Sequence, residues 1–306
     1  MNTLMSKARS VGAIVLASVV YGCLPVTLKI SYQYGATGIN AAFWMSISGT
    51  IILAILMIIC RVPFRLPRKA LKKILLLAIP GSAMTTVFLY YSYTRISAGL
   101  ATSLHYVYPV VIMLISVVWY HEKVTFLKIT ALVMTISGIC IISLNDVTID
   151  FLGILTALIS GCCWAFYILF LEKSGLSKEN ALRVNFYLAL FSIPACGILM
   201  FLTNSTKPIT APTGWLTLIL AAVASRAIAG PLFQMGVKGS GPVVSSLLST
   251  LEPITSVILG VLILNEHLSR SKQVGIYLVL SSVVIVLVSS AKSKKNQTVV
   301  SGQEAS

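Results

Sequence analysis

An apolar segment of membrane length occurs twice in this chain with the same internal spacing. Residues 245–266, SSLLSTLEPITSVILGVLILNE, carry Pro253 near the middle and end at Glu266. Residues 101–122, ATSLHYVYPVVIMLISVVWYHE, place Pro109 and Glu122 at the corresponding positions, 144 residues earlier. A midspan proline followed by an acidic helix end, once in each half, predicts a duplicated membrane protein with broken helices at its centre.

The composition sets the class of protein. Of 306 residues, 57% are hydrophobic and 10% are charged, and the mean hydropathy of +0.93 lies far outside the range of soluble domains. An α-helical span needs about 20 apolar residues. The sequence therefore predicts an all-α integral membrane protein with spans near residues 11–30, 38–60, 74–93, 98–120, 125–144, 151–172, 183–203, 214–237, 242–264 and 273–290. Because no repeated CxxC spacing occurs, the six cysteines are predicted to be buried packing residues.

The positive charges predict the orientation of these ten transmembrane helices. With an even number of spans, 17 of the 23 Lys and Arg residues fall on the side of the two termini, which indicates cytoplasmic ends in a cytoplasmic membrane. Since each half holds five spans, an odd number, the halves are predicted to be inverted repeats. The predicted boundaries are residues 1–146 and 147–290, followed by a disordered cytoplasmic tail at 291–306.

Several motifs resemble the drug/metabolite transporter superfamily in its EamA-type branch. The matching residues are Tyr21-Gly22 with Lys29, the run 88–93 (FLYYSY), the Pro109 module, Trp164-Ala165, and Leu251-Glu252-Pro253 with Glu266. This sequence has Phe43-Trp44 where members of the family often carry an arginine, and Tyr21-Gly22 where they often carry Trp-Gly. The resemblance implies a carrier that moves small metabolites, often exporting amino acids or xenobiotics, by alternating access of a central cavity.

Two charged residues stand near the middle of predicted spans, Glu252 and Arg226. A charge at the bilayer centre costs roughly 2.5 to 3.5 kcal/mol on insertion scales, so such residues face a partner, the bundle interior or water. Two interpretations remain open. The pair forms a structural clamp between spans 8 and 9, or both residues bind substrate or carry a proton in a central cavity.

Helical spacing places Ser245, Ser249, Glu252 and Ser256 on one face of span 9, which predicts a polar cavity wall. On span 4 the repeat sets His105 opposite Ser249 and Tyr108 opposite Glu252. The histidine is either a packed hydrogen-bonding residue or a functional one. Trp164, Tyr90 and Tyr108 lie deeper in their spans, where an aromatic ring can stack on a planar or apolar substrate. Tyr21 of span 1 completes the predicted cavity residues.

No enzyme signature such as HExxH, a P-loop or GxSxG is present. An intramembrane hydrolase would need a nucleophile and a base at one depth, and only His105 with Ser103 or Ser249 offers them. We expect no catalytic residues, metal, cofactor or nucleic-acid partner; the expected partners are the lipid bilayer and a small-molecule substrate. The oligomeric state stays open, a homodimer included. The alternative function is a membrane sensor or assembly partner on a transporter scaffold.

Overall fold

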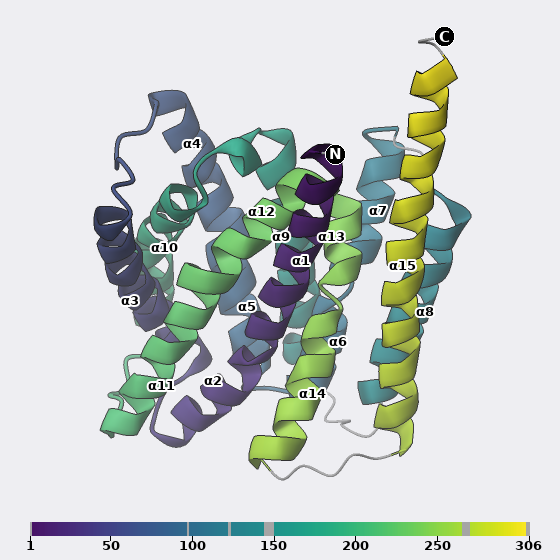
Figure 1. Cartoon of the computed structure of the whole chain (residues 1–306). Helices are drawn as coiled ribbons and strands as arrows, with labels where there is room; N and C mark the ends of the chain where they lie inside the picture. The colour runs from purple at the N-terminus through teal and green to yellow at the C-terminus, as the bar shows by residue number, and fades with distance from the viewer. Residues whose placement is uncertain (1, 97, 122–123, 144–149, 265–269, 304–306) are drawn as a thin grey trace.

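The computed structural model describes residues 2–96, 98–121, 124–143, 150–264 and 270–303, and every regular element in this part of the chain is a helix. The first half folds into five spans (Figure 1). In order, these are α1 (Asn2–Gly22) with α2 (Leu24–Gln33); α3 (Gly38–Ile59); α4 (Arg68–Leu77) with the π-helical η1 (Ala78–Ala83) and α5 (Met84–Ser92); α6 (Ala98–His105) with α7 (Tyr108–Val118); and α8 (Phe126–Ser143).

The second half repeats this pattern. Its spans are α9 (Phe151–Lys173), followed by the short 3₁₀ helix η2 (Leu176–Lys178); α10 (Ala181–Leu202); α11 (Pro212–Ala222) with the π-helical η3 (Val223–Ala229) and α12 (Gly230–Ser240); α13 (Pro242–Leu248) with α14 (Leu251–Leu264); and α15 (Arg270–Gln303). In the described residues, seven helical segments are long and apolar enough to cross a membrane, and three shorter apolar helices lie at 108–118, 126–141 and 273–286. The ten predicted spans are therefore all helical.

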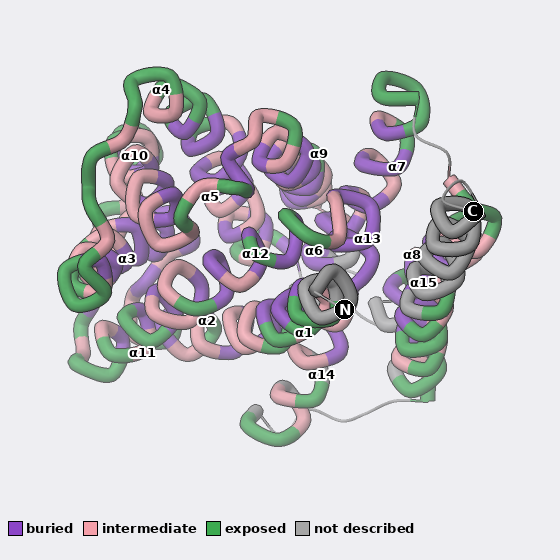
Figure 2. The backbone as a smooth tube through the Cα atoms, turned by 45° about the horizontal axis from the view of Figure 1, so that its top comes forward, coloured by how far each residue is buried: buried purple, intermediate pink, exposed green. Residues whose placement is uncertain are grey.

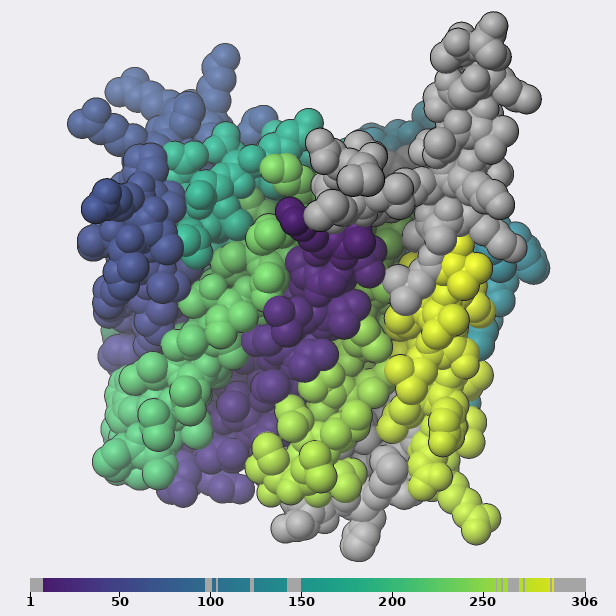
Figure 3. All heavy atoms as spheres, viewed as in Figure 1, coloured from purple at the N-terminus to yellow at the C-terminus, as the bar shows by residue number. Residues whose placement is uncertain are grey.

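The contacts between spans show the two-repeat architecture. Span 1 packs on span 8 through α1 with α12 and α2 with α11, and the corresponding pair, spans 6 and 3, packs through α9 with α5. Likewise α1 lies against α14, as α9 lies against α6 and α7. Figure 3 shows α1 and α2 on one face of the molecule, between α11–α12 and α14. Each of the remaining spans packs on its equivalent in the other repeat, α3 on α10 and α8 on α15. Exchanging the halves thus preserves the pattern of neighbours, as two inverted five-helix repeats require.

Helix interruptions also recur in both halves. The α6/α7 break precedes Pro109, and the α13/α14 break precedes Pro253. The π-helical segments η1 and η3 occupy equivalent places in spans 3 and 8. Proline lacks the N–H that would bond to the carbonyl four residues earlier, so a helix near it breaks or widens locally. Pro194 departs from this recurrence, because it lies inside α10 without interrupting that helix.

The outer surface of the bundle is apolar. Large side chains such as Ile58, Trp119 and Phe126 are exposed, and in Figure 2 exposed residues occur along the outer helices, including α3, α11 and the α8/α15 pair. In a bilayer these side chains meet lipid tails, and backbone groups are satisfied within the helices. The beginning of α1 and the end of α15 lie at one end of the bundle, which also carries the basic helix α4 (Figure 1).

Three sequence-based predictions differ from the structure or fall outside it. Only Cys196 is buried, whereas Cys60, Cys140 and Cys162 are exposed on the outer helix surfaces, where a thiol is apolar enough to meet lipid. Residues 291–303 continue α15, where a disordered tail was predicted, because Lys, Gln and Ala are adequate helix formers. Glu122 and Glu266, which end the repeated modules, lie outside the described residues.

Candidate functional site: a charged central cavity

A cavity of about 100 Å³ lies between the two repeats. Spans 1 to 4 and 6 to 9 contribute to its wall, so the α8/α15 pair stands apart from it. Six of the eight predicted site residues line this cavity: Tyr21, Tyr90, His105, Trp164, Arg226 and Glu252. Tyr108 and Ser249 are not among the lining residues.

Arg226 enters the cavity from the π-helical segment η3, near the middle of span 8. Its guanidinium Nη1 donates a hydrogen bond to the Ser82 hydroxyl, at 2.8 Å. Ser82 lies on η1, 144 residues earlier in the chain, which is the offset of the repeat, so this hydrogen bond joins the two π-helical segments. The stem of Arg226 packs against Gly49 of α3, where a Cβ would approach the arginine Cγ to 2.8 Å. A glycine and a hydroxyl therefore hold this cation in place.

Glu252 enters the cavity from the first turn of α14, where the backbone is broken. Pro253 has no N–H to offer the Ser249 carbonyl, which lies four residues earlier. That carbonyl instead accepts from the Glu252 amide, at 3.0 Å, and from the Tyr106 hydroxyl of the opposite repeat, at 3.0 Å. A bond from the neighbouring repeat thus satisfies the freed carbonyl, as the membrane interior requires.

Glu252 and Arg226 share the cavity without forming an ion pair. None of the ion pairs in the described part of the chain joins them, although Tyr21 and Tyr90 lie within electrostatic range of both. The predicted alternative of a structural clamp between spans 8 and 9 is therefore not the arrangement seen. Both residues are partly buried and line the cavity.

His105 is held by a hydrogen bond that fixes which ring nitrogen carries the proton. Its Nδ1 lies 2.9 Å from the Ser160 hydroxyl, and that hydroxyl donates its only proton to the Ala157 carbonyl, at 2.6 Å. Nδ1 must therefore be the donor to Ser160, which leaves the Nε2 of the neutral ring as an acceptor. This direction is the reverse of what a nucleophilic serine needs, because the histidine gives a proton to the serine and cannot remove one. Ser249, proposed as an alternative nucleophile, donates instead to the Ser245 carbonyl at 2.7 Å, and the side chain of Ser103 lies outside the described residues.

Aromatic rings form the non-polar part of the wall. Trp164 and Tyr167 stack with ring centroids 4.6 Å apart, and Tyr21 meets Trp164 edge to face at 6.3 Å. In the first repeat, the rings of Tyr90 and Tyr93 on span 3 stack with their centroids 6.1 Å apart. The faces of these rings can contact an apolar part of a ligand, and the tyrosine hydroxyls can form hydrogen bonds.

The two predicted residues outside the lining have packing roles. Tyr108 is fully buried, with its ring against His105 and Tyr106. Ser249 is buried, and the break before Pro253 interrupts the polar face that a continuous helix would have formed. Only Glu252 of that predicted face lines the cavity.

Sequence reasoning missed five polar lining residues that are not aromatic: Ser82, Thr85, Thr86, Asn185 and Ser225. Ser82 was detectable, because it occupies the repeat position of Arg226. Asn185 lies on α10 and donates to Gln234, which in turn donates to the carbonyls of Leu176 and Glu179. These partners make Gln234 a structural residue that ties α12 to the α9–α10 connection.

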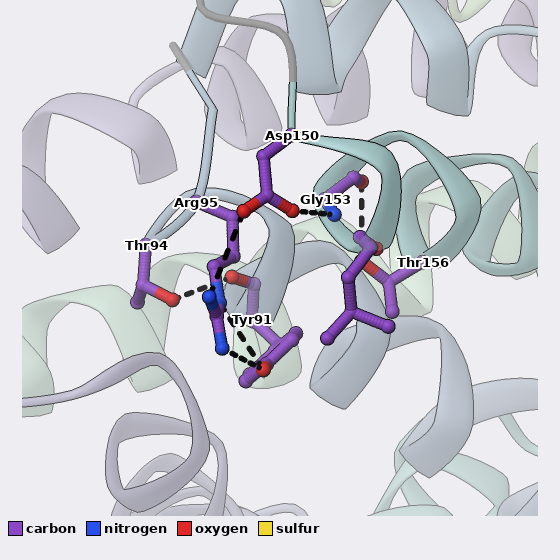
Figure 4. Close-up of polar contacts among 7 residues, drawn as sticks. Tyr91, Thr94, Arg95, Asp150, Gly153 and Thr156 are labelled. Carbon is purple, nitrogen blue, oxygen red and sulfur yellow. Dashed lines mark hydrogen bonds and ion pairs between the residues drawn. The ribbon is translucent and has the colours of Figure 1, made fainter.

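A polar cluster joins the repeats where α5 ends and α9 begins (Figure 4). Arg95 pairs with Asp150, with Nη1 and Oδ2 3.6 Å apart, and its Nη2 donates to the Tyr91 hydroxyl at 2.8 Å. The other Asp150 oxygen accepts from the Gly153 amide at 2.8 Å and caps α9. The cluster fixes the start of the helix that carries Trp164, relative to the helix that carries Tyr90.

Substituting Gly49 by Ala will displace the Arg226 side chain and lower transport several-fold. The added Cβ would lie 2.8 Å from the Arg226 Cγ and 3.0 Å from its Cβ, so the arginine must move and its bond to Ser82 weakens. Gly12→Ala is the matched control, because no atom lies within 4 Å of the added Cβ. Transport into proteoliposomes, normalised to folded protein, measures the effect. Equal rates for the two variants would contradict this account of how Arg226 is held.

The fold and the cavity together define a polytopic helical membrane protein with a charged chamber between two repeats, the class to which carriers belong. More particularly, the chain belongs to the EamA-like transporter family, whose model matches residues 9–144 and 151–288.

Named relatives agree with this assignment. The chain is 26% identical over 229 residues to an uncharacterized transporter, YvbV, of Bacillus subtilis strain 168, covering 72% of this chain and 74% of that protein. It is 27% identical over 173 residues to an uncharacterized transporter of Archaeoglobus fulgidus, covering 56% of this chain and 60% of that one. It is 23% identical over 206 residues to Protein PecM of Dickeya dadantii strain 3937, covering 65% and 68%. A protein of known crystal structure superposes with a TM-score of 0.74 over 94% of this chain and 99% of its own, at 15% identity, which supports the fold alone.

Proposed function

We propose that this protein is a secondary transporter that exports small metabolites, such as amino acids or drug-like compounds, across the cytoplasmic membrane. The observation that carries the proposal is the cavity between the repeats, with a cation and an anion at mid-span that do not neutralise each other. Ionisable groups at this depth mark substrate or ion pathways. The repeat architecture supports alternating access, in which one set of spans rocks against the other around a fixed site.

The arrangement around His105 argues against the hydrolase alternative, because the Ser160 proton is committed to the Ala157 carbonyl. The sensor alternative predicts that the cavity has no effect on export. A growth screen distinguishes the two. Cells that express the protein are challenged with toxic amino acids, their analogues and cationic drugs, beside cells with an empty vector and cells expressing Arg226→Gln. Increased resistance to at least one compound, lost in the variant, is expected for an exporter; the same growth in all three strains would count against transport.

Both termini are expected in the cytoplasm, because the end of the bundle that carries them also carries the basic helix α4 (Figure 1). A reporter fused after Ser306 should be active only in its cytoplasmic form. A matched fusion in the connection after α3, at residue 66, should report the same side. Activity of a periplasmic reporter at either junction would reverse the proposed orientation.

A further inference from the structure

The chain concentrates positive charge where α3 ends and α4 begins, at the end of the bundle that carries both termini (Figure 1). Residues 61–73, RVPFRLPRKALKK, contain six basic residues and no acidic one, and are called the basic segment below. Figure 3 shows side chains from this part of the chain, in blue, extending past the neighbouring helices. The six basic residues, all of them exposed, are Arg61, Arg65, Arg68, Lys69, Lys72 and Lys73.

The backbone of the basic segment is held against α10 of the second repeat. The Arg183 Nη1 donates to the Arg65 carbonyl at 3.0 Å, and the Tyr187 hydroxyl donates to the Phe64 carbonyl at 2.8 Å. The Phe64 ring also meets the Phe186 ring edge to face, with centroids 5.3 Å apart. Because these contacts use carbonyls and an aromatic ring, they fix the backbone and leave the basic side chains directed outward.

The protein supplies few counterions to the basic segment. None of the ion pairs between described residues includes any of its six basic side chains. The two carboxylates nearest in the second repeat, Glu172 and Glu179, are already paired with Lys173 and Arg183, at 3.9 and 2.9 Å. Lys73 donates to a backbone carbonyl at the end of α9, which does not neutralise its charge. The segment therefore presents its positive charge to whatever surrounds the protein.

The equivalent connection of the second repeat has the same turn without the charge. Arg61 and Asn204 follow α3 and α10 with φ of +53° and +51°, and the amides of Val62 and Ser205 each donate to the carbonyl five residues earlier, at 2.8 and 2.9 Å. Residues 204–216 contain Lys207 and no other charged residue. A left-handed residue at the end of a helix is usually Gly or Asn. The turn thus explains Asn204, whereas the arginine and the five basic residues after it need another reason.

Exposed apolar side chains adjoin the basic segment on both sides. Ile58 and Ile59 at the end of α3 are 67% and 69% exposed, and Leu75 and Leu76 on α4 are 44% and 53% exposed. In a bilayer such side chains lie among acyl chains. The basic segment, which joins them, is therefore held at the level of the lipid headgroups, where a positive cluster attracts anionic lipid.

We propose that the basic segment binds anionic phospholipids, such as phosphatidylglycerol, in the leaflet on the side of the termini. The guanidinium groups of Arg61, Arg65 and Arg68 bind phosphate oxygens through paired hydrogen bonds, and the three lysines add attraction as point charges. This inference goes beyond the proposed transport function, because the surface lies outside the cavity lining and its partner is independent of the substrate.

Thermal unfolding of the purified full chain in a mild detergent tests the inference. Dioleoyl phosphatidylglycerol, the zwitterionic dioleoyl phosphatidylcholine or inorganic phosphate is added at equal phosphate concentration. A ligand that binds only the folded protein raises its midpoint of unfolding, and phosphatidylglycerol should raise it by about 5 °C more than phosphatidylcholine does. Inorganic phosphate should have no comparable effect, because it lacks the acyl chains that place a headgroup beside the segment.

Charge-neutral variants assign the effect to the basic segment. Replacing all six basic residues by Gln should remove the difference between the two lipids. Arg65→Gln with Arg68→Gln should reduce it by about a third or more, since two of the six charges are lost. This double change leaves the backbone anchor intact, because Arg183 bonds to a carbonyl, and Arg65→Lys with Arg68→Lys should keep most of the difference. Arg9→Gln with Lys238→Gln, which removes two exposed charges elsewhere, is the matched control and should keep it fully.

Equal midpoints with the two lipids in the wild-type protein would overturn the inference, and would mean that the charges serve only to orient the chain during insertion. An undiminished difference in the sixfold variant would do the same, as would an undiminished difference in Arg65→Gln with Arg68→Gln if the sixfold variant is not recovered folded. A shift with inorganic phosphate as large as that with phosphatidylglycerol would show a simple anion site in place of a lipid surface. None of these results bears on transport, so the two proposals fail separately.

Discussion

Replacing Glu252 by Gln will lower the transport rate at least about tenfold, while the protein reaches the membrane at normal abundance. The substitution keeps the shape of the side chain and removes its charge. If Glu252 clamped Arg226, the change would leave an uncompensated buried charge, and breaking such a pair costs roughly 3 to 5 kcal/mol. Because Arg226 bonds to Ser82 instead, the loss should appear in transport and not in folding.

The double variant Glu252→Gln with Arg226→Gln separates these explanations. If Glu252 and Arg226 act on the substrate, the double variant should reach the membrane at normal abundance and still fail to transport. Transport recovered by the second substitution would show a structural pair and would remove Glu252 from the mechanism. Glu172→Gln controls for the loss of a carboxylate elsewhere, since Glu172 lies at the end of α9 beside Lys173.

Gly22→Val will lower the thermal stability of the protein and its folded yield far more than Gly12→Val, although both lie on α1. At Gly22 an added Cβ would meet the Thr255 Cβ at 2.5 Å and the Glu252 carbonyl at 2.7 Å. Small residues allow close approach of helices in membranes, and overpacking costs typically 1 to 3 kcal/mol. At Gly12 no atom lies within 4 Å.

Fluorescence-detected size-exclusion chromatography after heating measures this difference directly. A Gly22→Val variant as stable as Gly12→Val would mean that α1 does not pack on α14 as described. The two residues of the Tyr21-Gly22 motif at the end of α1 have different roles. Tyr21 lines the cavity, and Gly22 allows α1 to approach α14, the helix that carries Glu252.

Much of the architecture could be predicted from the sequence because the membrane simplifies the problem. Backbone groups must be satisfied within each span, so apolar length alone locates the helices. The equal spacing in the Pro109 and Pro253 modules predicted the repeat, and in the structure both prolines follow breaks between helices. Charge at mid-span located Arg226 and Glu252, which both line the cavity.

The details of the cavity could not be predicted in the same way. A regular period of 3.6 residues assumes a continuous helix. Because the helix is broken at Ser249, that residue is buried in the protein interior, whereas Glu252 lines the cavity. The π-helical segments change the direction of Ser82 and Arg226, and their positions have no simple periodic signal. The Ser160 bond that fixes His105 joins residues 55 apart, a relation that one sequence does not reveal.

Protection of a single cavity cysteine by substrate tests the central claim, that the chamber between the repeats is the transport site. Thr86→Cys is introduced into protein with all six native cysteines replaced by Ala, and Thr213→Cys at the exposed start of α11 is its control. A membrane-impermeant maleimide is applied with and without the compound identified in the growth screen. The account predicts that this compound slows labelling of Thr86→Cys and leaves Thr213→Cys unchanged. Labelling of Thr86→Cys at the same rate with and without a transported compound would contradict it.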